Sequence, residues 1–262
     1  MNYQTLRVRF EVSKPDGDED ICFLQLYRPE ANNTINDQMV KECIQVIEGC
    51  YHRAKIVVIE GLTDVFCFGA DFQGMANSLG TSVSSGEQGP ERLYNLWHML
   101  TSGPFVSIAH VKGRVNAGGV GFVTACDLAV ADSRAYFSLS ELLFGLMPAC
   151  VFPFLMRRMG FQRAHVMTLM THPISAKQAQ DFGLIDNCSE NSETQMHQYL
   201  QRLCRLNKVA IQRYKNYIST LDDSLLTAKP YALAANREVF TEPENLKKIA
   251  RYVNCGKFPW ED

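Results

Sequence analysis

The chain has 262 residues, a length that suits one large domain or one domain with a helical extension. Its 46% hydrophobic and 21% charged residues are ordinary for a soluble globular protein, and its formal net charge of −2 argues against a nucleic-acid partner. No apolar run approaches the ~20 residues of a membrane-spanning helix, and residues 1–10 alternate like a strand and not like a signal peptide. We therefore expect a cytoplasmic protein that binds neither nucleic acid nor a membrane.

The first half of the chain alternates predicted strands and helices. A helix is predicted at 38–48, after good N-cap residues at 33–37. Because strands separated by helices favour parallel βαβ units, the fold class is predicted to be α/β. The expected strands lie at 6–12, 21–27, 54–61, 104–111 and 127–131, the last one after a short helix.

Residues 78–90 form the one low-complexity stretch, rich in serine and glycine. They follow a suspected active-site motif, so they are either a lid over that site or a connector without function. The second half of the chain is predicted to be mostly helical. Its helices are expected near 150–159, 161–170, 175–182, 192–206, 208–221, 223–240 and 243–254.

Nine cysteines are scattered along the chain without a Cys-x-x-Cys pair. Most lie in apolar runs, as Cys22, Cys126 and Cys150 do. That pattern is typical of buried, reduced thiols in a cytosolic protein. Because the spacing of zinc ligands is missing, we expect no metal site and no disulfide framework.

Two glycine-containing segments follow predicted strands, at 65–72 and at 113–121. Glycine permits a tight turn that exposes backbone N–H groups, and the unpaired N–H groups at a helix N-terminus favour negative charge. Two such turns at neighbouring strand ends can aim two N–H groups at one oxygen, which makes an oxyanion hole for a thioester enolate. The alternative for each turn is a purely structural role. Neither the P-loop lysine nor the dinucleotide-binding spacing is present, so phosphate binding is not expected there.

A third segment, 138–148, contains Glu141 at the start of an apolar stretch. Glu141 is either a general base or an acidic residue that the dipole of a helix favours in its first turn.

These segments together resemble the crotonase (enoyl-CoA hydratase/isomerase) superfamily. Residues 66–72 are similar to its F-x-x-G-A-D-φ motif, 113–127 to its G-x-x-x-G-G-G-x-x-x-x-x-x-C-D segment, and 137–148 to its F-x-x-P-E-x-x-x-G-φ-x-P segment. Residues 27–36 resemble its opening motif. The resemblance covers roughly residues 5–255 in the expected order. It implies a crotonase fold with a ββα-type superhelical core at residues 1–200. It also implies a C-terminal helical trimerisation region at 201–262, in a homotrimer or dimer of trimers.

Carried over by position, the resemblance implies that the oxyanion N–H groups belong to Ala70 and Gly118. Glu141 then matches the second hydratase glutamate, which moves the proton at the substrate's α-carbon. The first hydratase glutamate is replaced by Gly121. With one carboxylate in place of two, the chain should not be an ordinary hydratase of straight-chain enoyl-CoA.

The residues after Pro29 are a second departure from the family. Many members have Lys or Arg there to meet CoA phosphates, whereas this chain continues with Glu30. That favours a thioester carried on the phosphopantetheine of an acyl carrier protein, with no other cofactor. Several segments, including 30–36, 138–145 and 258–262, resemble the dehydratases of polyketide β-branching cassettes. Those proteins convert 3-hydroxy-3-methylglutaryl-ACP to 3-methylglutaconyl-ACP.

Neighbouring polar residues have more than one predicted role. Asn116 either orients the leaving hydroxyl as a catalytic residue or caps the following helix. Asp71 is predicted to be a helix cap or an acid in the first turn of a helix and not a base, and His110 a strand-end histidine with satisfied hydrogen bonds. Basic residues of the helix expected at 202–215 either dock an acidic carrier protein or form a solvated face. The candidate cations for the substrate's distal carboxylate are Lys112, Arg114, Arg157, Arg158 and Arg163.

Three other functions compete with the dehydratase. One is an acyl-CoA hydratase or isomerase, and another is the sister methylglutaconyl-ACP decarboxylase. The third is a non-catalytic crotonase-like scaffold or RNA-binding protein, which the retained Glu141 and the net charge disfavour.

Overall fold

The computed structural model describes residues 3–12, 20–74 and 89–261. The stretch predicted to be a lid or a connector, 78–90, lies outside these ranges except for its last two residues, which begin a helix. None of the described helices combines the length and apolar character that a membrane crossing requires.

The larger of two sheets has six strands in the order β1-β2-β3-β5-β7-β10. The first pair is antiparallel and the other neighbours are parallel, which confirms the α/β prediction. The strands are β1 (Leu6–Val12), β2 (Asp20–Leu26), β3 (Ala54–Glu60), β5 (Val106–Val111), β7 (Leu128–Asp132) and β10 (Asn187–Ser189).

The smaller sheet has four short strands in the order β4-β6-β8-β9, of which the first three are parallel. The sequence did not predict them. They are β4 (Val65–Cys67), β6 (Arg114–Asn116), β8 (Tyr136–Ser138) and β9 (Ile174–Ser175).

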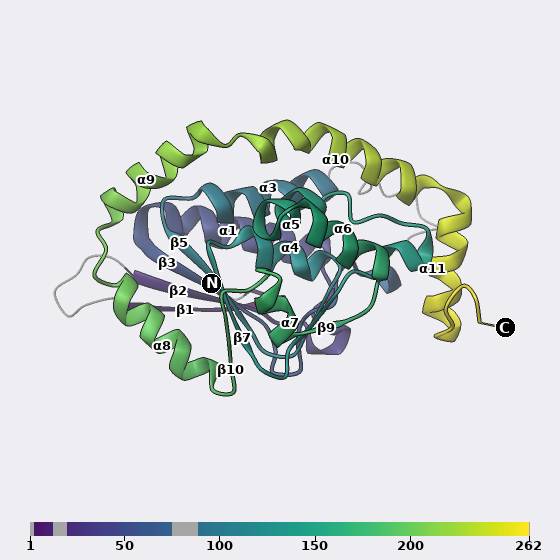
Figure 1. Ribbon diagram of the computed structural model, residues 1–262, viewed down its shortest axis with the longest axis horizontal. Coiled ribbons are helices and arrows are strands. Elements are labelled where there is room, and N and C mark those ends of the chain that lie inside the picture. Colours follow the sequence, from purple (N-terminus) through teal and green to yellow (C-terminus); the bar gives the residue numbers. More distant parts are fainter. Residues whose placement is uncertain (1–2, 13–19, 75–88, 262) are drawn as a thin grey trace.

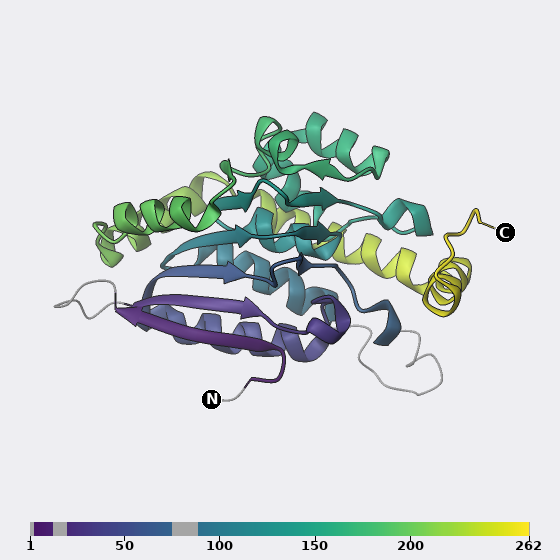
Figure 2. The same cartoon turned by 90° about the horizontal axis from the view of Figure 1, so that it is seen from below.

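Helices cover both faces of the larger sheet (Figures 1 and 2). The helices are α1 (Asp37–Arg53), α3 (Gly89–Ser102), α4 (Gly118–Ala125), α5 (Phe152–Met159), α6 (Phe161–Met170), α7 (Ala176–Asp181), α8 (Ser192–Leu203), α9 (Lys208–Leu221), α10 (Ser224–Thr241) and α11 (Pro243–Cys255), with the 3-10 helices η1 (Pro29–Ala31) and η2 (Glu141–Phe144).

Strand β3 shows why the sheet needs two helical layers. Val57 and Ile59 belong to the main core under the helix layer, whereas Ile56 and Val58 belong to a second cluster beneath α8. Because successive side chains of a strand point to opposite faces, a continuous apolar run such as this one is buried on both sides.

Helices α9 and α10 form an outer arm over α3 and α5 (Figure 1). Two lysines fasten the arm to the core. Lys208 donates to the backbone carbonyls of Cys50 and Ala54 at the end of α1. Lys215, which is 3% exposed, donates to the Phe105 carbonyl at 3.1 Å and forms an ion pair with Asp127 at 2.7 Å.

The basic segment 202–215 spans two helices, because α8 ends at Leu203 and α9 begins at Lys208, in agreement with the separate helices predicted at 192–206 and 208–221. Two of its predicted docking cations, Lys208 and Lys215, bind the protein's own backbone instead of forming a basic outer face. The boundary expected between residues 200 and 201 falls inside α8.

Candidate active site

The smaller sheet brings the three predicted motif segments together. Its parallel strands β4, β6 and β8 lie side by side, with Cys67 paired to Val115 and Asn116 paired to Ser138. Parallel strands end at the same edge of a sheet. The turn after β4, the turn after β6 and the segment after β8 therefore emerge next to one another.

The turn after β4 has the geometry expected of an oxyanion donor. Gly69 has φ +91°, and a Cβ added to it would lie 2.7 Å from the Ala117 Cβ, so glycine is required there. Ile35 pairs with this turn: its N–H donates to the Gly69 carbonyl at 2.7 Å, and its carbonyl accepts the Asp71 N–H at 3.1 Å. Because N–H groups alternate along extended backbone, the Ala70 N–H points away from Ile35, and it has no acceptor among the described residues.

The turn after β6 supplies the second amide. Ala117 adopts φ +50° and ψ −122°, a strained conformation for a residue with a side chain, and Gly118 begins α4. The Ala117 N–H donates to the Ser138 carbonyl at 3.0 Å. Gly118 lies in the first turn of the helix, where N–H groups lack intrahelical partners. The Gly69 Cα lies 3.8 Å from where a Gly118 Cβ would be, so the two turns are in contact.

Glu141 is the first residue of η2 and is 8% exposed. Its Oε2 has no hydrogen-bond partner among the residues that the structure describes. Burial raises the pKa of Glu141 to about 7, although the backbone N–H groups of Glu141 and Ser140 oppose the shift. A carboxyl with a pKa near neutrality suits both removal and return of a proton.

Asn116 connects the second turn to the segment that carries Glu141. Its Nδ2 donates to Ser140 Oγ at 2.9 Å, and its Oδ1 accepts from Ser138 Oγ at 2.8 Å. The prediction that it caps α4 is wrong, because Ala117 occupies the N-cap position and no described side chain caps this helix. Its predicted contact with a leaving hydroxyl stays a prediction.

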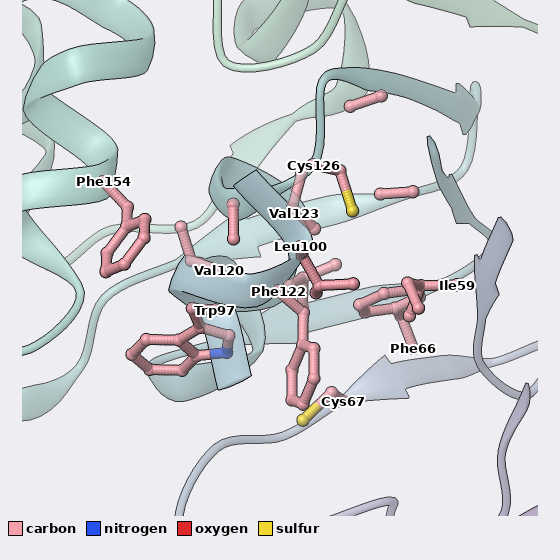
Figure 3. Packing of buried hydrophobic residues seen from close by; sticks show 14 of the residues in the cluster. Ile59, Phe66, Cys67, Trp97, Leu100, Val120, Phe122, Val123, Cys126 and Phe154 are labelled. Carbon is pink, nitrogen blue, oxygen red and sulfur yellow. The ribbon is translucent and has the colours of Figure 1, made fainter. Parts of the chain in front are cut away.

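The position of the missing hydratase glutamate is filled by an aromatic ring. A Cβ added to Gly121 would lie 2.3 Å from Cζ2 of Trp97, so no larger side chain fits while the indole stays in place. Figure 3 shows Trp97 among the apolar side chains packed around α4, with Phe122 and Phe154 as neighbours. The sequence did not identify Trp97 as part of the site, because nothing in its local pattern indicates a contact with α4.

Two other predictions about nearby polar residues are confirmed. Asp71 accepts the Gly74 N–H three residues on at 2.9 Å, as a helix cap does, and also pairs with Arg28 at 3.0 Å. His110 is 1% exposed, with one ring nitrogen 3.3 Å from Glu60 and the other 3.1 Å from Ser192 Oγ. Neither is a free acid or base.

The structure narrows the candidates for a distal-carboxylate cation. Four of the five candidates bind other groups of the protein. Three form ion pairs: Lys112 with Glu193, Arg157 with Asp222, and Arg158 with Asp186. Arg163 donates a hydrogen bond to the Phe182 carbonyl. Arg114 has no acidic partner among the described residues, and its guanidinium lies 5.4 Å from the ring centroid of Phe68.

Comparison with known proteins agrees with this architecture. The family model for enoyl-CoA hydratase/isomerase matches residues 16–262. The chain is 51% identical over 265 residues to the bacillaene synthase dehydratase PksH of Bacillus subtilis (strain 168), covering 100% of this chain and 98% of PksH. It is 29% identical over 226 residues to the 2,3-dehydroadipyl-CoA hydratase of Escherichia coli (strain K12), covering 84% of this chain and 86% of the relative.

The crystal structure of a polyketide biosynthesis enoyl-CoA hydratase (PksH) from Bacillus subtilis superimposes with a TM-score of 0.93 at 50% identity. The match covers 98% of this chain and 100% of that one. The predicted crotonase fold is thereby confirmed, and the chain belongs to the enoyl-CoA hydratase/isomerase family.

Proposed function

We propose that this enzyme removes water from 3-hydroxy-3-methylglutaryl-ACP to give 3-methylglutaconyl-ACP, as a dehydratase of polyketide β-branching. The observation that carries the proposal is the buried carboxyl of Glu141, which follows a strand next to the two glycine turns. Within the described residues, its Oε2 has no hydrogen-bond partner and the Ala70 N–H has no acceptor. The similarity to a named dehydratase of polyketide synthesis supports the reaction class.

The site supports elimination with a single acid–base group. The thioester oxygen lies between the N–H groups of Ala70 and Gly118, which stabilise the enolate, each donor by ~3–4 kcal/mol. Glu141 takes the proton from the α-carbon. It then returns that proton to the departing hydroxyl on the same face, and water leaves as the Cα=Cβ bond forms. A tertiary β-hydroxyl leaves more readily than a secondary one, so one acid suffices.

The packing around Gly121 supports a one-carboxylate mechanism. A second carboxylate at this position would need the space that the Trp97 ring fills. The other acid of the oxyanion turn, Asp71, is bound to Arg28 and to the Gly74 N–H. Glu141 is therefore the acid that we assign to both proton transfers.

The surroundings of Arg28 support a carrier-bound substrate over free CoA. This cation binds Asp71 at 3.0 Å and lies 3.7 Å from Glu30, so its charge is already balanced. A free CoA would bring the phosphates of its adenosine portion to the family's CoA-handling region, whereas a carrier-bound phosphopantetheine brings only one phosphate. We propose that the substrate thioester arrives on phosphopantetheine and that no further cofactor takes part.

Intact-protein mass spectrometry of 3-hydroxy-3-methylglutaryl-ACP tests the proposal. We expect the wild type to remove the mass of one water from the acyl carrier protein, and Glu141→Gln to remove none. Asp71→Asn is the matched control, because it changes a nearby carboxylate that is engaged as a cap; it should retain dehydration.

Three other outcomes contradict the proposal. An unchanged carrier protein together with turnover of an acyl-CoA establishes a hydratase or isomerase of CoA esters. Release of CO₂ from 3-methylglutaconyl-ACP establishes the sister decarboxylase. Dehydration that survives in Glu141→Gln removes Glu141 from the mechanism.

A further inference from the structure

Two buried side-chain polar atoms lack a hydrogen-bond partner in the part of the chain that the structure describes. One is Glu141 Oε2 and the other is Trp97 Nε1. Buried polar groups are almost always paired, and an unpaired one destabilises the folded state. The base role explains Glu141, whereas the mechanism above leaves the indole N–H of Trp97 without a function.

Trp97 is held firmly against the first turn of α4. Its ring makes T-shaped contacts with Phe122 at 6.1 Å and with Phe154 at 5.8 Å. Its Cζ2 lies 2.3 Å from where a Gly121 Cβ would be and 4.0 Å from where a Gly118 Cβ would be. The ring thus borders the glycine whose N–H is assigned to the oxyanion hole. Figure 3 shows the indole nitrogen on the edge of the ring turned away from Phe154.

We propose that the indole N–H of Trp97 is a catalytic hydrogen-bond donor to the β-oxygen of the substrate, which is the oxygen that leaves. This inference rests on the dehydratase function proposed above. The two unpaired atoms are complementary. A β-hydroxyl can donate a hydrogen bond to the ionised carboxylate of Glu141 or take a proton from its acid form, and it can accept a hydrogen bond from the Trp97 N–H.

The chemistry needs no proton from the indole. Glu141 takes the α-proton, and the electrons of the Cα–H bond form the enolate. As the enolate collapses to Cα=Cβ, the Cβ–O bond breaks and its electron pair stays on the departing oxygen. Glu141 returns its proton to that oxygen, and water leaves. The Trp97 N–H stabilises the negative charge that develops on the oxygen, and because an indole is a donor only, it cannot act as a second base.

Replacing the indole by a benzothiophene isolates the N–H group. The chain has two tryptophans, Trp97 and Trp260, so a Trp260→Phe protein keeps a single tryptophan, at position 97. Growth on 3-benzothienylalanine then replaces the N–H by sulfur while keeping the two fused rings. We expect kcat for dehydration to fall ~10- to 100-fold relative to the Trp260→Phe protein, the loss of one hydrogen bond to a developing charge.

A substrate without the hydroxyl provides the matched control. The analogue protein should exchange the α-proton of 3-methylglutaryl-ACP for deuterium as fast as the Trp260→Phe protein, because that step uses only Glu141 and the two backbone N–H groups. Its thermal stability should be equal or higher, since the replacement removes a buried unpaired donor. Equal dehydration rates, or dehydration and exchange lost in parallel, overturn the proposal.

A binding measurement separates this inference from the choice of substrate. In ¹⁵N-indole-labelled Trp260→Phe/Glu141→Gln protein, Trp97 gives the single indole N–H resonance. We expect 3-hydroxybutyryl-pantetheine to move this resonance downfield and butyryl-pantetheine to leave it in place. This result would support the inference even if 3-hydroxy-3-methylglutaryl-ACP is not turned over. Equal responses to the two ligands overturn the inference even if dehydration is confirmed.

Discussion

Burial of Glu141 raises its pKa and thereby sets the pH above which this carboxyl can act as a base. Because burial raises the pKa of this carboxyl to about 7, roughly half of the molecules hold it protonated at neutral pH. In the proposed mechanism the base form removes the α-proton, so kcat/KM should rise tenfold per pH unit below pH 7 and level off above it. Stopped-flow or quenched dehydration assays between pH 5 and 9 measure this profile. A rate that stays constant down to pH 5 contradicts the assignment of Glu141 as the base.

The same burial makes the folded state less stable as the pH rises. Below the unfolded pKa, near 4.5, both states are protonated and the group contributes nothing. Between pH 4.5 and 7 the unfolded state releases the proton and the folded state keeps it, so stability is lost, by up to about 3 kcal/mol above pH 7. Glu141→Gln should therefore gain stability over the wild type as the pH goes from 5 to 8, measured by urea unfolding.

Glu42 is the matched control, because it is a buried glutamate with the opposite shift. Burial raises its pKa, but hydrogen bonds from Gln4, Thr5 and Gln38 outweigh burial and lower it overall. A lowered pKa stabilises the folded state above the unfolded pKa, and this gain is lost as the pH falls. Glu42→Gln should therefore lose stability relative to the wild type at pH 8. If the stabilities of both variants relative to the wild type change in the same direction with pH, the pKa of Glu141 and that of Glu42 are not shifted in opposite directions.

Sequence motifs predict the backbone donors and the base that we propose, but they do not predict the side chains that pack around them. Gly69, Gly118 and Glu141 are recognisable because their local spacing is fixed by turns and a helix start. The bonds of Asn116 depend on its register opposite Ser138, and the place of Trp97 depends on how α3 packs on α4. Contacts of this kind arise only when distant segments meet.

At the scale of elements, α11 holds the turn that ends η2. Asn245 of α11 is 2% exposed, and its Nδ2 lies 3.0 Å from the Gly145 carbonyl and 3.1 Å from the Val239 carbonyl. The ring of Phe144 packs on Phe72, which follows the turn after β4, with the ring centroids 5.8 Å apart. The C-terminal helix thereby fixes the position of Glu141 relative to that turn.

Asn245→Ala should leave the Gly145 carbonyl without its buried donor and loosen η2. We expect about 1–3 kcal/mol lower stability and a slower reaction whose pH midpoint shifts towards the ordinary value for a glutamate, as water reaches Glu141. Unfolding curves and pH–rate profiles measure both effects. The control is Lys247→Ala on the same helix, where an exposed pair with Glu244 is lost and little should change. An unchanged pH midpoint in Asn245→Ala would show that α11 does not position the base.

The short strands explain why the elements of the site were harder to predict than the rest. The long strands β1, β2 and β3 show clear apolar patterns and were predicted within one residue. Strands β4, β6 and β8 have three residues each, too few to show alternation. They form because each pairs with strands that are distant in the chain, and they are the strands that precede the turns of the proposed site.

At the scale of the whole molecule, the outer arm exposes large apolar side chains. Tyr217, Leu221 and Tyr231 of α9 and α10 are 61%, 68% and 75% exposed. We expect a homotrimer or dimer of trimers in light scattering, with aspartate at these three positions giving smaller species. Val12→Asp is the control, since Val12 is 63% exposed on an edge strand outside the arm. A monomeric wild type contradicts the prediction. So does a Val12→Asp protein whose molecular mass falls as much as that of the protein with aspartate in the outer arm.

The fastening of the outer arm by Lys208 and Lys215 also bears on how the chain acquires its structure during synthesis. The core helices α1 and α3 emerge from the ribosome before the two lysines that bind carbonyls near their C-terminal ends. Until α9 is made and docks, those carbonyls must be solvated by water, and the apolar surface beneath the arm stays open. Docking of α9 therefore completes a core that began to form at the strands made before it, and closure of this part of the domain must await the emergence of that helix.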